Sequence, residues 1–541
     1  MISQVSLRNV RLFGDESRAF QLKPLTVFCG SNSSGKSTIL KVFPLLRQTQ
    51  GIRESAEEVS GKLRFKGTQV DLGNYFSLVT DNEIARQMHF GIRVRTSAPK
   101  SVYEFLLYIK RNTKVEFTPS KQGDAPEEFD LDYSFVFVAE NPGGTESSSF
   151  KSGKHIGGNL LNAEFEVTVK GESLLKWSVD KLDKVEAAID ETAKSDFIDE
   201  ITQRLYKINL PSAFFEKVGM AEHMQPQSSE NPERTTLIAL LRGLLPVALI
   251  ANPKTESDQA AAGSEHSYTR WPIPPIIEWQ HEVFKSALLN LNYVAPLRTP
   301  GKRYYITELD SVPGMDPTGE FLPYILRDKK QTLVLNTSPN ELRKEKNEPL
   351  SSALGGWLRY LRTGTFVGDE QKQTEFELAT SEIHTEVKLK SLINTKTHSL
   401  ADSGFGYSQI VPILVRGLLA PADGTLVVEQ PELHLHPALQ VRIADFFLAM
   451  ASIGKQVIIE THSEHLVNAI RVKAAEDTTN ELHKLCKIYF LSTESEKPQV
   501  RDLSVQADGS LNEWPECFFG EALTLSGRLL RAQNKMRINR K

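Results

Sequence analysis

Residues 25–43, LTVFCGSNSSGKSTILKVF, decide the fold of this chain. An apolar, strand-like run leads into a glycine loop, and a run with the apolar spacing of a helix follows the loop. The loop fits the pattern G-x-x-x-x-G-K-[ST], whose backbone N–H groups converge on phosphate oxygens at a helix N-terminus. The order strand, loop, helix therefore predicts an α/β fold with a parallel sheet and a phosphate-binding loop.

The side chains of this loop have expected roles. Lys36 would reach the β- and γ-phosphate oxygens of a nucleotide, and Ser37 would hold Mg²⁺ at the start of the helix. The alternative is a glycine turn in an ordinary strand–helix unit. The predicted nucleotide-binding residues are Gly30, Ser31, Asn32, Ser33, Ser34, Gly35, Lys36, Ser37 and Thr38.

The composition is that of an ordinary soluble chain. Its 541 residues include 64 Lys and Arg against 68 Asp and Glu, a formal net charge of −4, and three cysteines. This length allows roughly two to four domains. The wide spacing of Cys29, Cys486 and Cys517 argues against a disulfide framework or a zinc site, and no stretch approaches about 18 apolar residues. The sequence therefore predicts a cytoplasmic protein that does not span a membrane.

Two further apolar runs end in polar residues. Residues 426–430, LVVEQ, would place the Glu429 carboxylate beside Mg²⁺, and residues 458–463, IIETHS, would place His462 near a terminal phosphate or an attacking water. Each run by itself could also be a structural strand. Because Glu429 lies far along the chain from Lys36, both can serve one nucleotide only if a large insertion separates them.

A second glycine loop, SGFGYSQ at residues 403–409, enters the helical run IVPILVRGLL. Its N–H groups and hydroxyls suit a phosphate, although a flexible helix entry is the alternative. The candidate ligand residues are Ser403, Gly404, Gly406 and Ser408.

Together these motifs resemble the ABC/SMC-type ATPase family. GSNSSGKST is similar to its Walker A motif, SGFGYSQ to its signature loop, VVEQPELHLHP to its Walker B motif and ETHSEHL to its switch histidine. The wording EQPELHLHP with THSEHL and WPECFFG resembles compact bacterial members of the family. These are the overcoming-lysogenization-defect ATPases and the PtuA ATPases of Septu and retron anti-phage systems. The resemblance covers roughly residues 1–95 and 290–520.

The resemblance implies an assembly as well as a site. In that family two heads sandwich two ATP molecules, and each Walker A motif faces the partner's signature loop. Ser403, Gly404, Gly406 and Ser408 would therefore touch ATP bound to another subunit. The implied cofactors are ATP and Mg²⁺, and the implied assembly is a homodimer or a higher oligomer through the ATP-sandwich heads.

Two positions depart from the family pattern. The usual acid pair after Walker B is Glu429–Gln430 here, and an amide accepts no proton, so we expect slow ATP hydrolysis unless Glu432 or His462 substitutes. The predicted catalytic residues are Glu429, Gln430 and His462, and the predicted metal ligands are Ser37 and Glu429. The family's lid glutamine is either Gln48 or Gln69.

The predicted domains follow from where the motifs stop. Residues 1–95 form an N-terminal ATPase lobe, 96–290 an inserted α+β or helical domain, 291–520 a C-terminal ATPase lobe, and 521–541 a basic helical tail. Within the insertion, we expect an amphipathic helix over residues 185–208. We also expect a buried or partner-binding helix in LIALLRGLLPVALIA, residues 237–251.

The resemblance implies an ATP-gated sensor or regulatory subunit of a prokaryotic anti-phage complex that controls a separately encoded HNH-type nuclease effector. In the retron version, a reverse transcriptase and its DNA–RNA product would join. The alternative is a RecF/SMC-like DNA-repair ATPase that binds duplex DNA, for which residues 96–290 lack a clear coiled coil or basic face. A third interpretation is a nucleotide-binding scaffold without turnover.

Three further groups of polar residues have two interpretations each. His434 and His436 favour a structural or subunit-contact role over metal binding. Arg298 and Arg303 favour interface or phosphate contacts over ordinary surface positions. The basic residues 528–541 either bind nucleic acid or an acidic partner, or form a solvated end.

Overall fold

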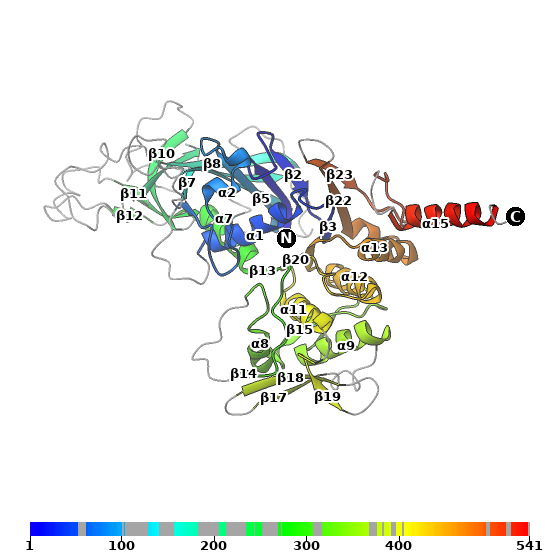
Figure 1. Ribbon diagram of the computed structural model, residues 1–541. Coiled ribbons are helices and arrows are strands. Elements are labelled where there is room, and N and C mark those ends of the chain that lie inside the picture. Colours follow the sequence, from blue (N-terminus) through cyan, green and yellow to red (C-terminus); the bar gives the residue numbers. More distant parts are fainter. Residues whose placement is uncertain are drawn as a thin grey trace, which may run out of the picture. The chain divides into compact units, whose positions relative to one another are not determined.

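The computed structural model describes most of the chain as two compact units (Figure 1). The first unit contains Met1–Leu22, Ser37–Tyr293 and Asp423–Thr425, and the second contains Lys23–Lys36, Val294–Ala422 and Leu426–Lys541. The described residues are 1–51, 61–99, 102, 128–139, 156–181, 205–211, 234–242, 244–251, 269–271, 273–306, 316–366, 376–380, 384–390, 396–402, 405–493, 498–515 and 521–538.

An antiparallel sheet dominates the first unit, with strands in the order β12-β11-β10-β9-β8-β7-β6-β5-β1-β2 and β4 paired to β7. Apolar side chains alternate with partly exposed ones along β6 and β7, which is the pattern of a sheet with one covered face. The strands are β1 (Ile2–Arg8), β2 (Arg18–Gln21), β4 (Lys62–Leu63), β5 (Met88–Ser97), β6 (Glu128–Ala139), β7 (Gly158–Val169), β8 (Glu172–Lys181), β9 (Leu205–Pro211), β10 (Arg234–Arg242), β11 (Leu245–Ala251) and β12 (Thr269–Trp271).

Helix α7 (Pro275–Leu289) packs on this sheet through buried polar and aromatic contacts. Tyr133 Oη donates to Gln280 O at 2.7 Å, and Trp177 Nε1 donates to Gln280 Oε1 at 2.7 Å. These bonds satisfy polar groups that burial would otherwise leave unpaired. The other helices of this unit are α1 (Lys36–Thr49), α2 (Tyr75–Leu78) and the 3₁₀ turn η1 (Thr80–Asn82).

The region between the motifs differs from the sequence expectation. No unit boundary falls at residue 95, because β6 to β12 continue the same sheet as β1, β2 and β5. A unit boundary does fall between Tyr293 and Val294, close to the predicted residue 290. The predicted helix over 237–251 is wrong: β10 and β11 form an antiparallel hairpin there. A continuous apolar run does not separate helix from strand, and Gly243 and Pro246 interrupt a helix. The predicted helix over 185–208 lies outside the described residues up to 204, and its end belongs to β9.

The second unit is built on a largely parallel sheet. Strands β20 (Thr425–Glu429), β21 (Gln456–Glu460), β3 (Leu25–Gly30), β22 (Cys486–Ser492) and β23 (Gln499–Leu503) lie side by side in that order. β3 pairs in parallel with β21 and β22, whereas β23 is antiparallel. Every residue of β20 and β21 is buried, as expected for strands covered on both faces.

Helices α9, α11, α12 and α13 pack against one another beside this sheet (Figure 1). Their contacts bury Trp357 and Phe446, whose rings meet edge to face at 5.1 Å between centroids. The helices of this unit are α8 (Leu322–Lys329), α9 (Leu350–Thr363), α11 (Phe405–Leu419), α12 (Pro437–Ser452), α13 (Glu464–Glu476), α14 (Leu482–Leu485) and α15 (Glu521–Ile538). No described helix is both long and apolar enough to cross a membrane.

Two small sheets complete the second unit. One has the order β14-β18-β17 with β19 paired to β18, and the other pairs β15 with β16. Their strands are β14 (Tyr305–Ile306), β15 (Leu333–Asn336), β16 (Lys346–Pro349), β17 (Phe376–Thr380), β18 (His384–Lys390) and β19 (Thr397–Ser399), and the chain passes from the first unit to the second within β13 (Leu291–Val294).

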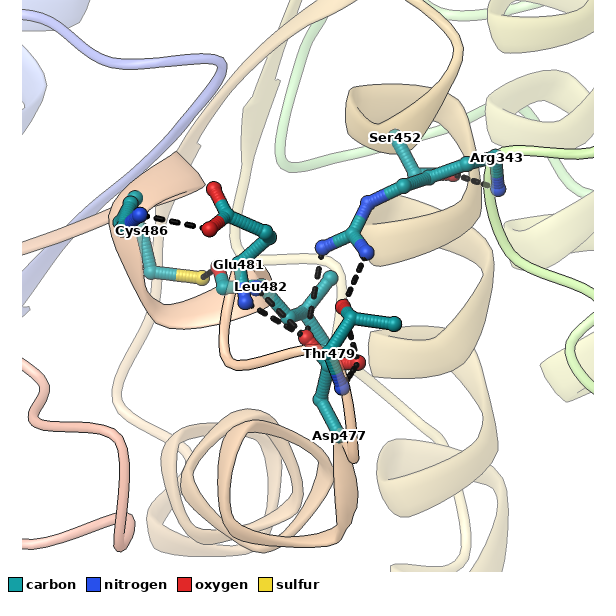
Figure 2. A network of polar contacts seen from close by, with 8 residues as sticks. Arg343, Ser452, Asp477, Thr479, Glu481, Leu482 and Cys486 are labelled. Atoms are coloured by element: carbon teal, nitrogen blue, oxygen red, sulfur yellow. Dashed lines mark hydrogen bonds and ion pairs between the residues drawn. The ribbon is translucent and has the colours of Figure 1, made fainter.

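A carboxylate organises the turn between α13 and α14, shown in Figure 2. Asp477 Oδ2 accepts hydrogen bonds from Glu481 N at 3.0 Å and Leu482 N at 2.7 Å, and Asp477 Oδ1 accepts from Thr479 N at 3.1 Å. Arg343 Nη2 pairs with Asp477 Oδ2 at 3.3 Å. One side chain thus satisfies N–H groups that a helix start leaves unpaired.

Candidate functional site

The glycine loop joins β3 to α1, as the sequence predicts. Its backbone takes positive φ angles at Gly30 (130°), Ser33 (58°) and Gly35 (95°). A Cβ on Gly30 would lie 1.9 Å from Leu491 O, so only glycine fits where the loop leaves the sheet. Ser31 N donates to the same Leu491 oxygen at 3.0 Å, which fixes the start of the loop to β22.

Lys36 folds its side chain back over this loop. Its Nζ donates hydrogen bonds to Ser31 O at 2.6 Å, Gly30 O at 3.3 Å and Ser34 Oγ at 3.3 Å. Burial lowers the pKa of the Lys36 ammonium, while the nearby Glu460 carboxylate acts in the opposite direction. The ammonium is therefore a partly desolvated cation at the loop, where it can meet phosphate oxygens.

The carboxyl ends of β3, β20 and β21 meet at one edge of the sheet. Gln430 N donates to Glu460 O at 2.8 Å, and Thr461 N donates to Phe28 O at 2.9 Å. Glu429 and Glu460 end β20 and β21 with only 2% of their surface exposed. The edge of the sheet next to the glycine loop thus carries two buried acidic residues.

These residues suit a magnesium nucleotide. The loop supplies backbone N–H groups and the Lys36 ammonium for phosphate oxygens. The Glu429 carboxylate, at the end of β20, supplies an oxygen ligand of the kind that Mg²⁺ prefers. The donor set therefore fits both predicted cofactors.

Glu432 and His462 form a connected pair. Glu432 Oε1 accepts from His462 N at 2.6 Å, and Glu432 Oε2 accepts from Thr461 Oγ1 at 2.8 Å. Burial raises the pKa of Glu432 despite these hydrogen bonds. Both carboxylate oxygens are engaged, so Glu432 holds the segment that carries His462.

The surroundings of the His462 imidazole favour its neutral form. Burial lowers its pKa, the Lys36 ammonium lowers it further, and a hydrogen bond to the Gly30 backbone acts in the opposite direction. A neutral imidazole near the loop can accept a proton from water or donate its own N–H to a phosphate oxygen.

The two predicted signature residues that the structure describes lie at the start of α11. Ser408 is buried, and a Cβ on Gly406 would lie 3.3 Å from His434 O. The helix start therefore packs closely against the segment that follows Gln430. Ser403 and Gly404 lie outside the described residues.

The structure separates the two candidate lid glutamines. The amide of Gln48 is buried and bonded to the backbone, with Oε1 accepting from Val70 N at 3.1 Å and Nε2 donating to Arg64 O and Val70 O. Gln69 Oε1 is buried without a hydrogen-bond partner. Gln48, in α1, holds the segment of residues 64–70 in place. Gln69 is therefore the candidate whose side-chain oxygen is not committed to the backbone.

The other singled-out residues have different surroundings. His436 is the N-cap of α12 and accepts from Ala438 N at 3.3 Å, and the described part of the chain has no cluster of metal-ligating side chains. Arg303 is exposed and pairs with Asp402 at 3.0 Å. Arg298 is buried, which does not support the predicted interface contact, while the predicted phosphate contact stays a prediction. Its Nη2 donates to Glu429 O at 2.7 Å.

Sequence reasoning passed over Glu460 and did not anticipate the contact that Arg298 makes at this edge. Glu460 stands directly before the predicted Thr461–His462 pair, and an acid that ends an apolar strand was a usable signal. Nothing in the sequence around Arg298 indicates its contact with Glu429, because only the fold brings the two residues together.

Comparisons with known proteins give a family for the chain. The model of the family described as AAA ATPase domain matches residues 1–208 and 323–467. No curated protein matches the sequence.

The chain is also similar, at low scores, to solved Smc head domains. One structure, an Smc head bound to the C-winged helix domain of ScpA, has 11% identity and a TM-score of 0.35, with 93% of this chain and 98% of that chain covered. A Pyrococcus furiosus Smc head with an extended coiled coil has 12% identity and a TM-score of 0.32, with 100% and 99% covered. The Thermotoga maritima SMC head has 9% identity and a TM-score of 0.32, with 93% and 98% covered. TM-scores this low add nothing to the fold described above.

Proposed function

The chain belongs to the AAA ATPase domain family, and from that premise we propose that it is the ATP-binding, slowly hydrolysing sensor subunit of a prokaryotic anti-phage complex. ATP binding would control a separately encoded nuclease effector of HNH type. The single observation that carries the ATP part is the convergence of the Lys36 loop with Glu429, Glu460 and His462 at one sheet edge.

ATP and Mg²⁺ are the cofactors this proposal requires. Lys36 and the loop N–H groups would hold the phosphates, and Ser37 and Glu429 would hold the metal. Bound Mg²⁺ would neutralise phosphate charge. His462 would orient the attacking water or the terminal phosphate, and Glu432 would keep His462 in place.

Slow turnover is proposed from Gln430. A carboxylate at this position would take a proton from water, whereas an amide cannot. Both oxygens of Glu432 already accept hydrogen bonds, so Glu432 is poorly placed to take over. A slow ATPase would remain in its ATP state for long periods, which suits a sensor.

The proposed assembly is a homodimer or higher oligomer whose heads sandwich ATP. The support is the sequence motif at residues 403–409 and its place at the start of α11, beside the segment that follows Gln430. Ser408 of one subunit would then contact ATP held by another. Size-exclusion chromatography with light scattering, with and without ATP, tests this assembly.

The defence role is supported by the wording of EQPELHLHP and THSEHL, and a pull-down from the native locus tests it. The tagged chain and its Lys36→Ala variant are isolated, and bound proteins and nucleic acid are identified. A stoichiometric nuclease, with or without a reverse transcriptase and its DNA–RNA product, supports the proposal. Isolation of the chain alone, binding duplex DNA directly, contradicts it and favours a DNA-repair ATPase.

A further inference from the structure

Arg298 connects the two motifs that the proposed ATP sandwich would place on different nucleotides. It lies in the loop between β13 and β14, with 3% of its surface exposed. We propose that Arg298 is a positioning residue that ties the start of α11 to the Glu429–Gln430 turn, so that α11 and the metal-binding carboxylate move together. This inference rests on the proposed function, because it assigns α11 to the partner's ATP.

The Arg298 guanidinium binds backbone oxygens of the Glu429–Gln430 turn. Arg298 Nη2 donates to Glu429 O at 2.7 Å and to Gln430 O at 3.4 Å. Two successive carbonyl oxygens therefore accept hydrogen bonds from one cation. A planar guanidinium holds such a pair in a fixed direction, whereas a lysine ammonium on a flexible stem does not.

The turn needs to be held, because Gln430 has a left-handed backbone with φ of 45°. A non-glycine residue keeps this conformation only where its surroundings impose it. Gln430 N donates to Glu460 O at 2.8 Å, and Gln430 O accepts from Leu433 N at 3.3 Å. Arg298 adds the remaining contact to that carbonyl, so its loss would loosen the residue next to Glu429.

The backbone of Arg298 reaches the other motif. Gln409 Nε2 donates to Arg298 O at 3.3 Å and lies 3.5 Å from Ser408 Oγ. Gln409 is 1% exposed, in the first turn of α11. A single residue thus contacts Ser408's neighbour through its backbone and Glu429 through its side chain.

The residues around Arg298 leave little room for it to move independently of α11. Thr299, next to Arg298, is bonded to Thr318, with N donating to Thr318 O at 3.0 Å. A Cβ on Gly319, which follows Thr318, would lie 2.8 Å from Pro412 Cγ, so the segment that contains Thr318 and Gly319 packs tightly on α11. A displacement of α11 would therefore be felt at Arg298.

The far end of α11 is fixed to the same sheet. Lys455, directly before β21, donates Nζ to Gly417 O at 3.1 Å and to Leu418 O at 2.9 Å. These are carbonyls of the last helical turn, which a cation stabilises. Helix α11 is thus held at both ends to elements that carry Glu429 and Glu460.

The test compares Arg298→Lys and Gln409→Ala with wild type in the full chain. Arg416→Lys is the matched control, because Arg416 is also 3% exposed but lies in the last turn of α11. Four quantities are measured: affinity for a fluorescent ATP analogue with Mg²⁺, ATP-dependent dimerisation by sedimentation, kcat against KM, and amide hydrogen exchange of residues 429–433 without nucleotide.

We expect Arg298→Lys to retain ATP-analogue affinity within about threefold while dimerisation and kcat each fall about 10-fold or more, because misplacement of a positioned group acts mainly on the later steps. Hydrogen exchange at 429–433 should accelerate in both variants and not in Arg416→Lys. The double variant should lose no more than the worse single one.

Unchanged dimerisation and exchange in Arg298→Lys would overturn the inference, and so would equal losses in Arg416→Lys, which indicate general destabilisation. If wild type itself binds no ATP analogue, the proposed function fails. The exchange measurement still decides the positioning role in that case, because it needs no nucleotide.

Discussion

Two segments of the second unit are each organised by one carboxylate, but folding shifts the pKa values of the two carboxylates in opposite directions. The turn at residues 477–482 gathers three backbone N–H groups on Asp477, and the segment after β21 gathers His462 N and Thr461 Oγ1 on Glu432. In both places one carboxylate accepts several hydrogen bonds from a short segment between two elements.

The pKa values of the two carboxylates shift in opposite directions. Burial tends to raise the pKa of Asp477, but hydrogen bonds from Thr479, Leu482 and Glu481 outweigh it and leave the pKa far below its usual range. Burial raises the pKa of Glu432 and is not outweighed. The Asp477 turn is therefore a stabilising cap, whereas Glu432 is a charge kept at a cost beside the Lys36 loop.

The opposite pKa shifts of Asp477 and Glu432 indicate different roles for the two carboxylates. A charge retained in an unfavourable place is a candidate for function, whereas a charge in a favourable place needs only a structural explanation. Changes at the nucleotide edge should thus reduce activity with little loss of stability, and changes at Asp477 should do the reverse.

The largest expected effect is that of Lys36→Ala. The variant should lose ATP hydrolysis by a factor on the order of 10²–10³, because a preorganised cation is removed from the developing phosphate charge. Its unfolding temperature without nucleotide should stay the same or rise, since a desolvated ammonium disappears. Malachite-green assays and calorimetry measure both, and a strongly destabilised variant would break the contrast.

Glu432→Gln should come next. An amide can accept only part of the hydrogen bonding that Glu432 gives to His462 N and Thr461 Oγ1, so the switch segment should loosen. We expect hydrolysis to fall about 10- to 100-fold, with stability at pH 7 little changed. Glu341→Gln, an exposed carboxylate paired with Lys344, is the control. Equal activity in both variants would contradict the role assigned to Glu432.

Asp477→Asn should affect stability instead. Removing the ionised acceptor of three N–H groups and of Arg343 should lower the free energy of unfolding by about 1–3 kcal/mol. ATP hydrolysis well below the unfolding temperature should match wild type. Urea denaturation measures the loss, and Asp328→Asn, whose carboxylate pairs with Arg327 at 2.8 Å, serves as the control.

The smallest expected effect is the pH dependence of the stability difference between wild type and each of the variants Asp477→Asn and Glu432→Gln. The pKa of Asp477 is lowered in the folded state, so its contribution is complete above the unfolded value of about 3.9 and fades as pH falls below it. The pKa of Glu432 is raised, so the folded state binds its proton more readily, and wild type should gain stability relative to Glu432→Gln as pH falls. Urea melts at pH 7 and pH 3 should show the two differences moving in opposite directions.

The sequence predicted which strand ends and which loop would meet at the proposed nucleotide edge, because that information is local. The loop before α1 is a contiguous motif, and the acids that end β20 and β21 directly follow apolar runs. The parallel arrangement of the strands then brings their ends together. What could not be read depends on contacts between distant residues. Arg298 reaches Glu429 only through the fold, and the backbone bonds that commit Gln48 come from residues 64–70.

The large antiparallel sheet shows the opposite limit. Residues 237–251 are almost entirely apolar, with Arg242 as the one charged residue, so their period does not distinguish helix from strand. Pairing with β9 and β12 decides the outcome. The predicted boundary at 95 fails to match the compact units for the same reason, whereas the boundary at 290 lies close to the change of unit at Tyr293–Val294. A strand joins whichever sheet offers it an edge, irrespective of where the motifs begin.

The most direct test of the central claim is the steady-state rate of ATP hydrolysis of wild type and Gln430→Glu, with Lys36→Ala as the background. The claim is that the edge at Lys36, Glu429 and His462 is an ATPase site slowed by an amide. We predict a wild-type rate below about 1 s⁻¹ and a rise of about 10-fold or more in Gln430→Glu. A wild-type rate well above that value, with no gain in Gln430→Glu, would contradict the claim.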